Sequence, residues 1–114
     1  MLADYASAKL DLNIDQGDTY YQEFTLTQAN GTPLNLTDLS LNGSIKAYRG
    51  VSTTTASFTV TKIDAVNGII ALSLPILTTA NLKKSMYVYV VYGVDGVSSS
   101  TINLLSGNVY VDNL

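Results

Sequence analysis

The side chains that could carry out chemistry in this sequence are carboxylates, because it contains no histidine and no cysteine. The commonest acid–base group and metal ligand is therefore missing, as are thiol nucleophiles, thiolate metal sites and disulfides. Asp15 and Asp18 flank Gly17, and a loop of oxygen donors such as this could hold Ca²⁺. Two carboxylates could also hydrolyse a glycosidic bond. EF-hand spacing is absent, however, and Asp and Gly are ordinary turn residues, so we expect no catalytic residues, no metal and no cofactor.

The eight tyrosines are the second group of chemically distinctive residues. An exposed tyrosine can stack on a sugar ring or dominate a protein interface. Tyr20, Tyr21, Tyr87, Tyr89 and Tyr92 fall within segments whose pattern predicts strands, where aromatic side chains commonly pack in the core or against neighbouring strands. Packing, protein binding and glycan binding are therefore the open roles for these side chains.

Alternation of apolar and polar residues predicts the strands that position these side chains. Residues 10–14 alternate in this way, and a second alternating run covers residues 20–27. The Asp/Gly-rich segment 15–18 between them predicts a tight connection, so we expect the chain to open with two strands of a half-buried sheet. Asn30-Gly31 then predicts a hairpin turn, and the Pro-Leu-Asn-Leu segment at 33–36 is expected at a sheet edge.

The rest of the chain continues this pattern of strands and turns. Met86 to Val94 is apolar at nearly every position, which predicts a central strand buried on both faces. A Thr-rich segment with Thr as N-cap predicts at most one short helical turn near 78–84, and Ser106-Gly107 predicts a bulge in the last strand. Further strands and turns are expected at 39–48, 56–61, 67–68, 70–74, 95–96, 101–105 and 108–111.

Together these segments predict an all-β fold, an immunoglobulin-like antiparallel β-sandwich of about seven strands. A small closed barrel is the alternative that short, evenly spaced strands also permit. With 114 residues, of which 46% are hydrophobic, the chain is long enough to bury one core. We expect an N-terminal arm over residues 1–8, with Leu2 and Tyr5 as apolar contacts, and a single β-sandwich domain over residues 9–114.

The charge pattern narrows the range of partners. Charged residues make up only 13% of the sequence, and a surface so weakly hydrated suits a protein that works inside an assembly. The net charge is −3 and the cations are scattered apart from Lys83-Lys84, so we expect no binding to nucleic acid. No apolar run approaches the ~20 residues of a membrane helix, so we expect no membrane insertion. The N-terminus lacks the features of a secretory signal, which indicates a protein made in the cytosol.

The segment IDQGDTYYQEFTLTQANGTPLNLT, residues 14–37, resembles a recurrent virion domain of tailed bacteriophages. Downstream, GIIALSL at 68–74, a Tyr-rich strand with Asp95-Gly96, and LLSGNV at 104–109 follow in the same order. The whole is similar to the small immunoglobulin-like structural proteins of tailed phages, including the amino-terminal domains of baseplate upper proteins. This resemblance implies a non-enzymatic building block or adaptor. It brings no catalytic residues with it, because its motifs are turns and strands.

We therefore expect a virion protein of the tail, baseplate or neck, assembled in the host cytoplasm. Its partners would be other virion structural proteins and copies of itself, bound through strand edges and tyrosine-bearing faces. A capsid decoration protein of the same fold and a carbohydrate-binding module using surface tyrosines are the alternatives. The candidate interface residues are Leu2, Tyr5, Tyr87, Tyr92, Val109, Tyr110 and Val111.

Overall fold

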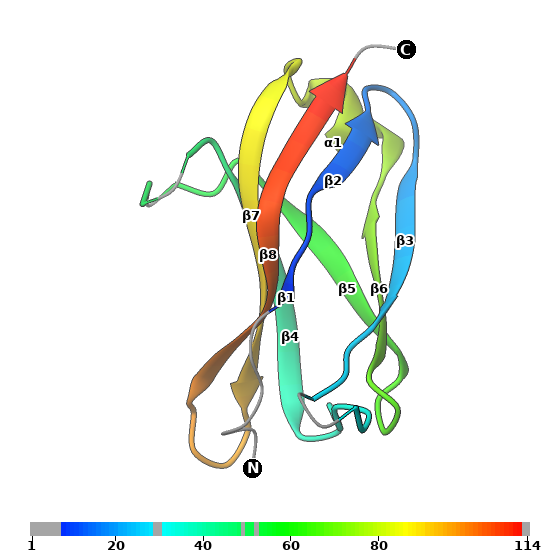
Figure 1. Ribbon diagram of the computed structural model, residues 1–114. Helices are drawn as coiled ribbons and strands as arrows, with labels where there is room; N and C mark the ends of the chain where they lie inside the picture. Colours follow the sequence, from blue (N-terminus) through cyan, green and yellow to red (C-terminus); the bar gives the residue numbers. More distant parts are fainter. Residues whose placement is uncertain (1–7, 29–30, 49, 52, 113–114) are drawn as a thin grey trace.

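Eight β-strands make up most of the part of the chain that the computed structural model describes, which is residues 8–28, 31–48, 50–51 and 53–112 (Figure 1). The first four strands are β1 (Ala8–Lys9), β2 (Leu12–Asp15), β3 (Tyr20–Thr25) and β4 (Leu39–Lys46). They are followed by β5 (Ala56–Asp64), β6 (Ile69–Leu74), the short helix α1 (Ile76–Asn81), β7 (Ser85–Asp95) and β8 (Thr101–Asp112). The prediction of an all-β chain with one short helical turn is confirmed.

The strands form one curled sheet that folds into two facing layers (Figure 1). Hydrogen bonding follows the order β1-β8-β7-β4-β5-β6-β3, and β2 also pairs with β8. β5 joins the layers, because Ala56 to Phe58 pair with β4 while the residues from Thr59 onward pair with β6. We call β1, β2, β8, β7 and β4 the larger sheet, and β5, β6 and β3 the smaller sheet. The predicted sandwich arrangement is therefore confirmed.

The first two strands run parallel to β8, which differs from the predicted antiparallel sandwich. Leu12 of β2 lies opposite Val109 of β8. The tight connection after Asp15 forms, with the Asp18 amide donating to the Asp15 carbonyl over 3.2 Å, but it carries the chain from the larger sheet to the smaller one. Apolar residues of both β2 and β3 point into the same core. The alternation of apolar and polar residues is therefore the same whether the two strands form a hairpin or lie in different sheets.

Both sheets contribute side chains to that core. Leu72 of β6 and Val91 of β7 are each 0% exposed. Aromatic rings from three strands meet there, with the Phe58 centroid 5.9 Å from that of Tyr20 and 6.0 Å from that of Tyr89. Tilted and edge-on contacts at these distances add to the free energy gained by burying the rings. The smaller sheet is thus fixed against the larger one through aromatic as well as aliphatic packing.

β7 is a central strand, as predicted, but only one of its faces is fully buried. Tyr87, Tyr89 and Val91 are buried, whereas Val88 and Val90 between them are half-buried. The strand lies between β4 and β8, and the smaller sheet covers the inner face. No described element covers the outer face of the larger sheet, which is why the prediction of burial on both faces was wrong.

The predicted helical turn is α1, and its cap differs from the prediction. The N-cap is Pro75 and not a threonine, and no side chain caps the helix. Thr79 is buried, with its hydroxyl 2.7 Å from the Asp18 carbonyl oxygen and 3.1 Å from that of Ile76. This threonine therefore ties α1 to the connection between β2 and β3, and its hydroxyl donates to carbonyl oxygens instead of capping the helix N–H groups.

The bulge in β8 lies at Leu104, two residues before the predicted Ser106-Gly107. One extra residue of β8 sits between the partners of Val91 and Tyr92. The added residue breaks strict alternation, so that Leu104 and Leu105 are both in the core, with 0% and 3% of their surface exposed.

Of the predicted Asn30-Gly31 turn, Gly31 lies within the described residues, and its φ of +87° fits a tight turn. The segment that follows was expected at a sheet edge, but it forms no named strand. Leu34 and Leu36 are fully buried, and their amides donate to the carbonyls of Leu26 and Ala65 over 3.0 and 2.8 Å. These leucines therefore close one end of the core instead of extending a sheet.

Candidate protein-interaction surface

Three of the predicted interface side chains lie inside the molecule. Tyr87, Val109 and Val111 are 8%, 0% and 2% exposed. The Tyr87 hydroxyl donates to the Lys83 carbonyl over 2.9 Å, so even its polar group is engaged within the chain. Successive side chains of a strand point to opposite faces, so residues 109 and 111 point inward and residue 110 between them points outward. These three side chains are therefore unavailable to a partner of the folded chain.

Two other predicted residues share the outer face of the larger sheet. Tyr92 of β7 is half-buried, and Tyr110 of β8 is 38% exposed. The remaining two, Leu2 and Tyr5, lie outside the described residues. Among the predicted interface residues that the structure describes, Tyr92 and Tyr110 are therefore the two whose side chains face outward.

The backbone of the C-terminal strand is not free to pair with another chain, contrary to expectation. Val109 lies opposite Tyr87 of β7 on one side and Leu12 of β2 on the other. Val111 is enclosed in the same way, by Ser85 and by β2. Strand addition requires an open edge with unpaired N–H and C=O groups. The N-terminal strand occupies that edge of β8.

The open edge of the smaller sheet belongs to β3, which pairs with β6 and no other described strand. Gln22 and Glu23 are exposed in the middle of this strand, and polar or charged residues on an edge discourage the addition of further strands. Tyr21 is 57% exposed, and its hydroxyl donates to Glu23 over 2.7 Å. That hydrogen bond is the main cause of a raised pKa for Tyr21.

A stripe of apolar side chains runs along β7 on the outer face of the larger sheet. Met86 is 55% exposed, and the residues that follow it on this face are half-buried. We call these side chains the outer stripe, which consists of Met86, Val88, Val90, Tyr92 and Val94. Polar residues border most of it, namely Thr101, Asn103, Ser106 and Asn108 from β8 and Ser40, Asn42, Ser44 and Lys46 from β4. An apolar centre with a polar rim is the usual organisation of a protein interface.

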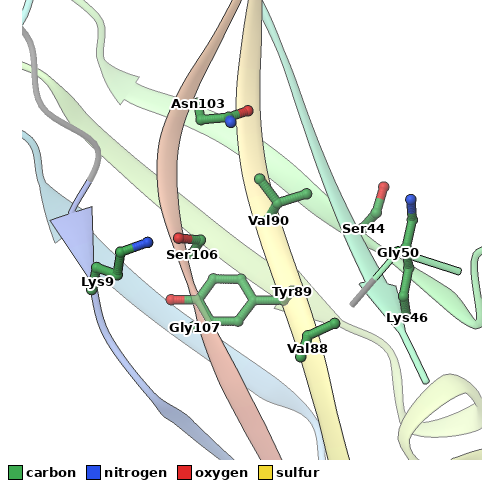
Figure 2. A pocket seen from close by; sticks show the side chains of 10 residues that line it. All are labelled: Lys9, Ser44, Lys46, Gly50, Val88, Tyr89, Val90, Asn103, Ser106 and Gly107. Atoms are coloured by element: carbon green, nitrogen blue, oxygen red, sulfur yellow. The ribbon is translucent and has the colours of Figure 1, made fainter. Parts of the chain in front are cut away.

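A hollow of about 320 Å³ opens on this face (Figure 2). Val88 and Val90 of the outer stripe lie at its centre, and Lys9 of β1 and Lys46 of β4 stand on opposite sides. The remaining lining residues are Ser44, Gly50, Tyr89, Asn103, Ser106 and Gly107. The strand register explains this grouping, because Lys9, Ser106, Val90 and Ser44 occupy one row across β1, β8, β7 and β4.

Contacts of the backbone hold Lys9 beside this hollow. The amide of the next residue, Leu10, donates to the Ser106 carbonyl over 2.9 Å. The Tyr89 hydroxyl donates to the Leu10 carbonyl over 2.6 Å. A Cβ atom on Gly107 would lie 2.2 Å from the Leu10 carbonyl oxygen, so only glycine lets β1 approach β8 this closely. The position of Lys9 is thus fixed by residues about eighty to a hundred positions later in the chain.

The hydroxyls of the buried Tyr20 and Tyr89 are engaged in hydrogen bonds within the chain. Tyr20 donates to the Gln22 side chain over 3.0 Å, and burial raises the pKa of Tyr20 to about 12. Burial is also the main cause of a raised pKa for Tyr89, with smaller contributions from the charges of Tyr20 and Asp11. Both phenols therefore stay protonated as hydrogen-bond donors at neutral pH.

The acidic loop considered for calcium acts as a turn. The Asp18 carboxylate accepts a hydrogen bond from the Thr19 amide over 3.0 Å, and a shallow hollow of about 120 Å³ lies beside it and Asp15. In residues 8–112, apart from the gaps given above, no cluster of three or more His, Cys, Asp or Glu side chains could hold a metal ion. No helix among those residues is long and apolar enough to cross a membrane.

Comparison with known proteins identifies the fold. No family model and no curated protein sequence matches the chain. Among solved structures, the N-terminal domain of phage TP901-1 ORF48 is similar over 91% of this chain and 94% of that domain, with a TM-score of 0.62 and 13% sequence identity. A family 123 glycoside hydrolase from Clostridium perfringens aligns with 94% of this chain but 23% of its own length, with a TM-score of 0.40 and 10% identity. The second likeness is too low to carry an argument, whereas the first shows that this chain has the fold of an N-terminal domain of a phage protein, as the sequence resemblance predicted.

Proposed function

We propose that this chain is a non-enzymatic structural or adaptor protein of a bacteriophage virion, located in the tail, baseplate or neck. The observation that carries the proposal is the fold similarity to the N-terminal domain of phage TP901-1 ORF48, which spans nearly the whole of both chains. The order of turn and strand motifs along the sequence supports the same assignment independently.

The chain would act by burying surface against its neighbours, which are other virion proteins and further copies of itself. The outer face of the larger sheet is the contact surface that the geometry favours. Its outer stripe is apolar, its rim is polar, and no described element covers it. The edge of β3, with Gln22 and Glu23 exposed, is less suited to strand addition.

A reconstruction of the intact particle by electron cryomicroscopy tests the location. We expect density for the sandwich in the tail, baseplate or neck, with a neighbouring subunit on the outer face of the larger sheet. Density on the capsid surface would instead identify a decoration protein. Absence of the chain from purified particles, checked by mass spectrometry, would contradict the proposal.

Sizing of the purified chain by light scattering tests self-association separately. A multimer at micromolar concentration would show that copies bind each other without help. A monomer would mean that contacts between copies depend on the other virion proteins. Loss of the multimer in a Met86→Ser variant would assign that contact to the outer stripe.

A further inference from the structure

We propose that the hollow on the outer face of the larger sheet receives the side chain of a Glu or Asp from an extended segment of a neighbouring virion protein. This inference rests on the proposed function and names the chemistry of its partner. The segment lies along β7, with its acidic side chain in the hollow and apolar side chains on either side against the outer stripe.

The charges of the hollow select an anionic group. Lys9 and Lys46 stand on opposite sides of it, and neither forms an ion pair with a described residue. No carboxylate is among the lining residues. The two lysines lie on strands three steps apart in the sheet, about 14 Å at the usual strand spacing. That leaves room for one extended segment between them, with one lysine on each side of it.

The neutral polar groups of the hollow are available for hydrogen bonding. The side chains of Ser44, Asn103 and Ser106 line it, and none of them is hydrogen-bonded to another described residue. Hydroxyl and amide donors beside two ammonium groups fit a carboxylate, which accepts several hydrogen bonds at once. Bonds of this kind are about twice as strong as those between neutral groups.

The outer stripe determines what flanks the acidic residue. Val88 and Val90 lie at the centre of the hollow, and Met86 and Tyr92 extend the apolar surface in both directions along β7. In an extended segment every second side chain faces the same way, about 6.6 Å apart. Apolar residues two positions before and after the acid would therefore rest on the stripe, which gives an apolar-x-Glu-x-apolar pattern.

A protein segment suits this site better than a sugar acid. Protein sites that hold sugars commonly offer an exposed aromatic face for the ring to stack on. The only aromatic residue among the lining residues is Tyr89, which is 3% exposed and has its hydroxyl on the Leu10 carbonyl. The hollow, at about 320 Å³, is also at the small end of small-molecule sites.

The test is an NMR titration of the full ¹⁵N-labelled chain with two capped peptides, acetyl-Val-Ser-Glu-Ser-Val-amide and its counterpart with Gln in place of Glu. We expect the Glu peptide to shift the amide signals of Lys9, Ser44, Lys46, Val90 and Ser106 in a saturable manner. The Gln peptide should bind about tenfold more weakly, because it lacks the charge. Equal affinity for both peptides, or no saturable shift up to the solubility of the Glu peptide, would overturn the proposal.

Variants of the two lysines locate the binding site. Lys9→Met and Lys46→Met keep much of the side-chain length and remove the charge, so each should weaken Glu-peptide binding about tenfold. Lys83→Met changes an exposed lysine outside the hollow and should leave the affinity unchanged. Unchanged affinity in the first two variants, with the signals of other residues in their native positions, would overturn the assignment, as would an equal loss in the control.

A third titration, with glucuronic acid, distinguishes the source of the carboxylate. Weak or absent binding is expected, whereas tighter binding than the Glu peptide at the same amides would replace the protein partner with an acidic glycan. These titrations and the particle reconstruction can fail independently. If the chain is present in the virion but its hollow does not bind the Glu peptide, the proposed binding site is refuted and the proposed function stands.

Discussion

The two sheets share one core but present different outer faces. On the smaller sheet, an outward row joins Thr59, Ser73 and Tyr21, and each of these side chains carries a hydroxyl group. On the larger sheet, the corresponding central strand carries the apolar outer stripe, and a hollow lies there between Lys9 and Lys46. The outer faces differ in this way although, in both sheets, apolar side chains alternate along the strands to face the core.

This contrast separates what maintains the fold from what can select a partner. The inner faces need side chains that are apolar and of suitable size, and many combinations satisfy that requirement. The outer faces are free to vary without loss of the core. A TM-score of 0.62 at 13% identity with the N-terminal domain of phage TP901-1 ORF48 is what such freedom produces. Partner specificity in this fold should therefore be sought on the outer faces, and the comparison of the two faces can be tested directly.

The largest effect is expected at the core side of the smaller sheet. Leu72 is 0% exposed, so Leu72→Ala should lower the free energy of unfolding by about 2–5 kcal/mol through lost burial and a new cavity. The next residue, Ser73, faces outward, and Ser73→Ala should change stability by less than about 0.5 kcal/mol. Urea denaturation measures both. Similar losses in the two variants would show that the outer face of the smaller sheet contributes to stability as much as the core does.

The second effect is alkaline destabilisation through the core tyrosines, one from each sheet. Burial raises the pKa of Tyr20 from 10.0 to about 12, and it raises that of Tyr89 as well. Since the folded-state pKa lies above the unfolded value, the stabilisation is complete below about pH 10 and is lost as pH rises through about 12. At 1.36 kcal/mol per pKa unit, Tyr20 alone accounts for up to about 3 kcal/mol.

Unfolding by urea at pH values between about 9 and 12 measures this loss. Tyr20→Phe and Tyr89→Phe should each reduce the slope of stability against pH, because phenylalanine has no proton to lose. If the double variant kept the slope of the natural chain, the tyrosines would not be its cause, and the idea that both sheets share one protected core would be weakened.

The sequence was sufficient to predict the fold class and part of the core. Alternation in segments such as 10–14 and 70–74 reflects burial on one face of a sheet, and that physical requirement is local. Residues 12, 14, 70, 72 and 74 are in the core accordingly, whereas Leu10, which belongs to the same alternating pattern, is 42% exposed. The bulge and the helix cap were misplaced, because Leu104 and Thr79 follow tertiary contacts that outweigh local preference.

The candidate site could not be predicted, because its parts come from distant segments. Lys9 and Ser44 reach the same row only through the pairing of β1 with β8, β8 with β7, and β7 with β4. The parallel pairing of β1 has no local signal, since a hairpin would show the same alternation. The sequence does contain one signal for the outer face. In a strand over Met86 to Val94 the even-numbered residues share one face, so Tyr92 and the buried Tyr87 must point to opposite sides of the sheet.

A third prediction compares the outer faces through two residues of nearly equal exposure. Met86 on the larger sheet is 55% exposed, and Tyr21 on the smaller sheet is 57% exposed. Changing either to Ser should alter stability by less than about 0.5 kcal/mol. Met86→Ser should nevertheless enter particles about fivefold less well than the natural chain, because a buried apolar contact is lost. Tyr21→Ser should enter equally well.

Competition between variant and natural chains during particle assembly, read by mass spectrometry, gives these ratios. The opposite ranking, with Tyr21→Ser impaired and Met86→Ser normal, would move the contact surface to the smaller sheet. Circular dichroism of both variants ensures that the ratios report binding and not folding.

The smallest effect is expected from the ion pair between Lys84 and Asp112, whose atoms are 3.9 Å apart. Its side chains are 63% and 65% exposed, so solvent and salt screen the attraction. Lys84→Met should change the free energy of unfolding by less than about 0.5 kcal/mol, with or without 1 M NaCl in the urea titration. Lys46→Met should be equally mild for stability, because Lys46 forms no ion pair with a described residue, yet it should weaken binding to the Glu peptide. If Lys46→Met instead destabilised the chain more than Lys84→Met, its charge would serve the fold, and the division between a core that holds the sandwich together and an outer face that binds a partner would fail at that residue.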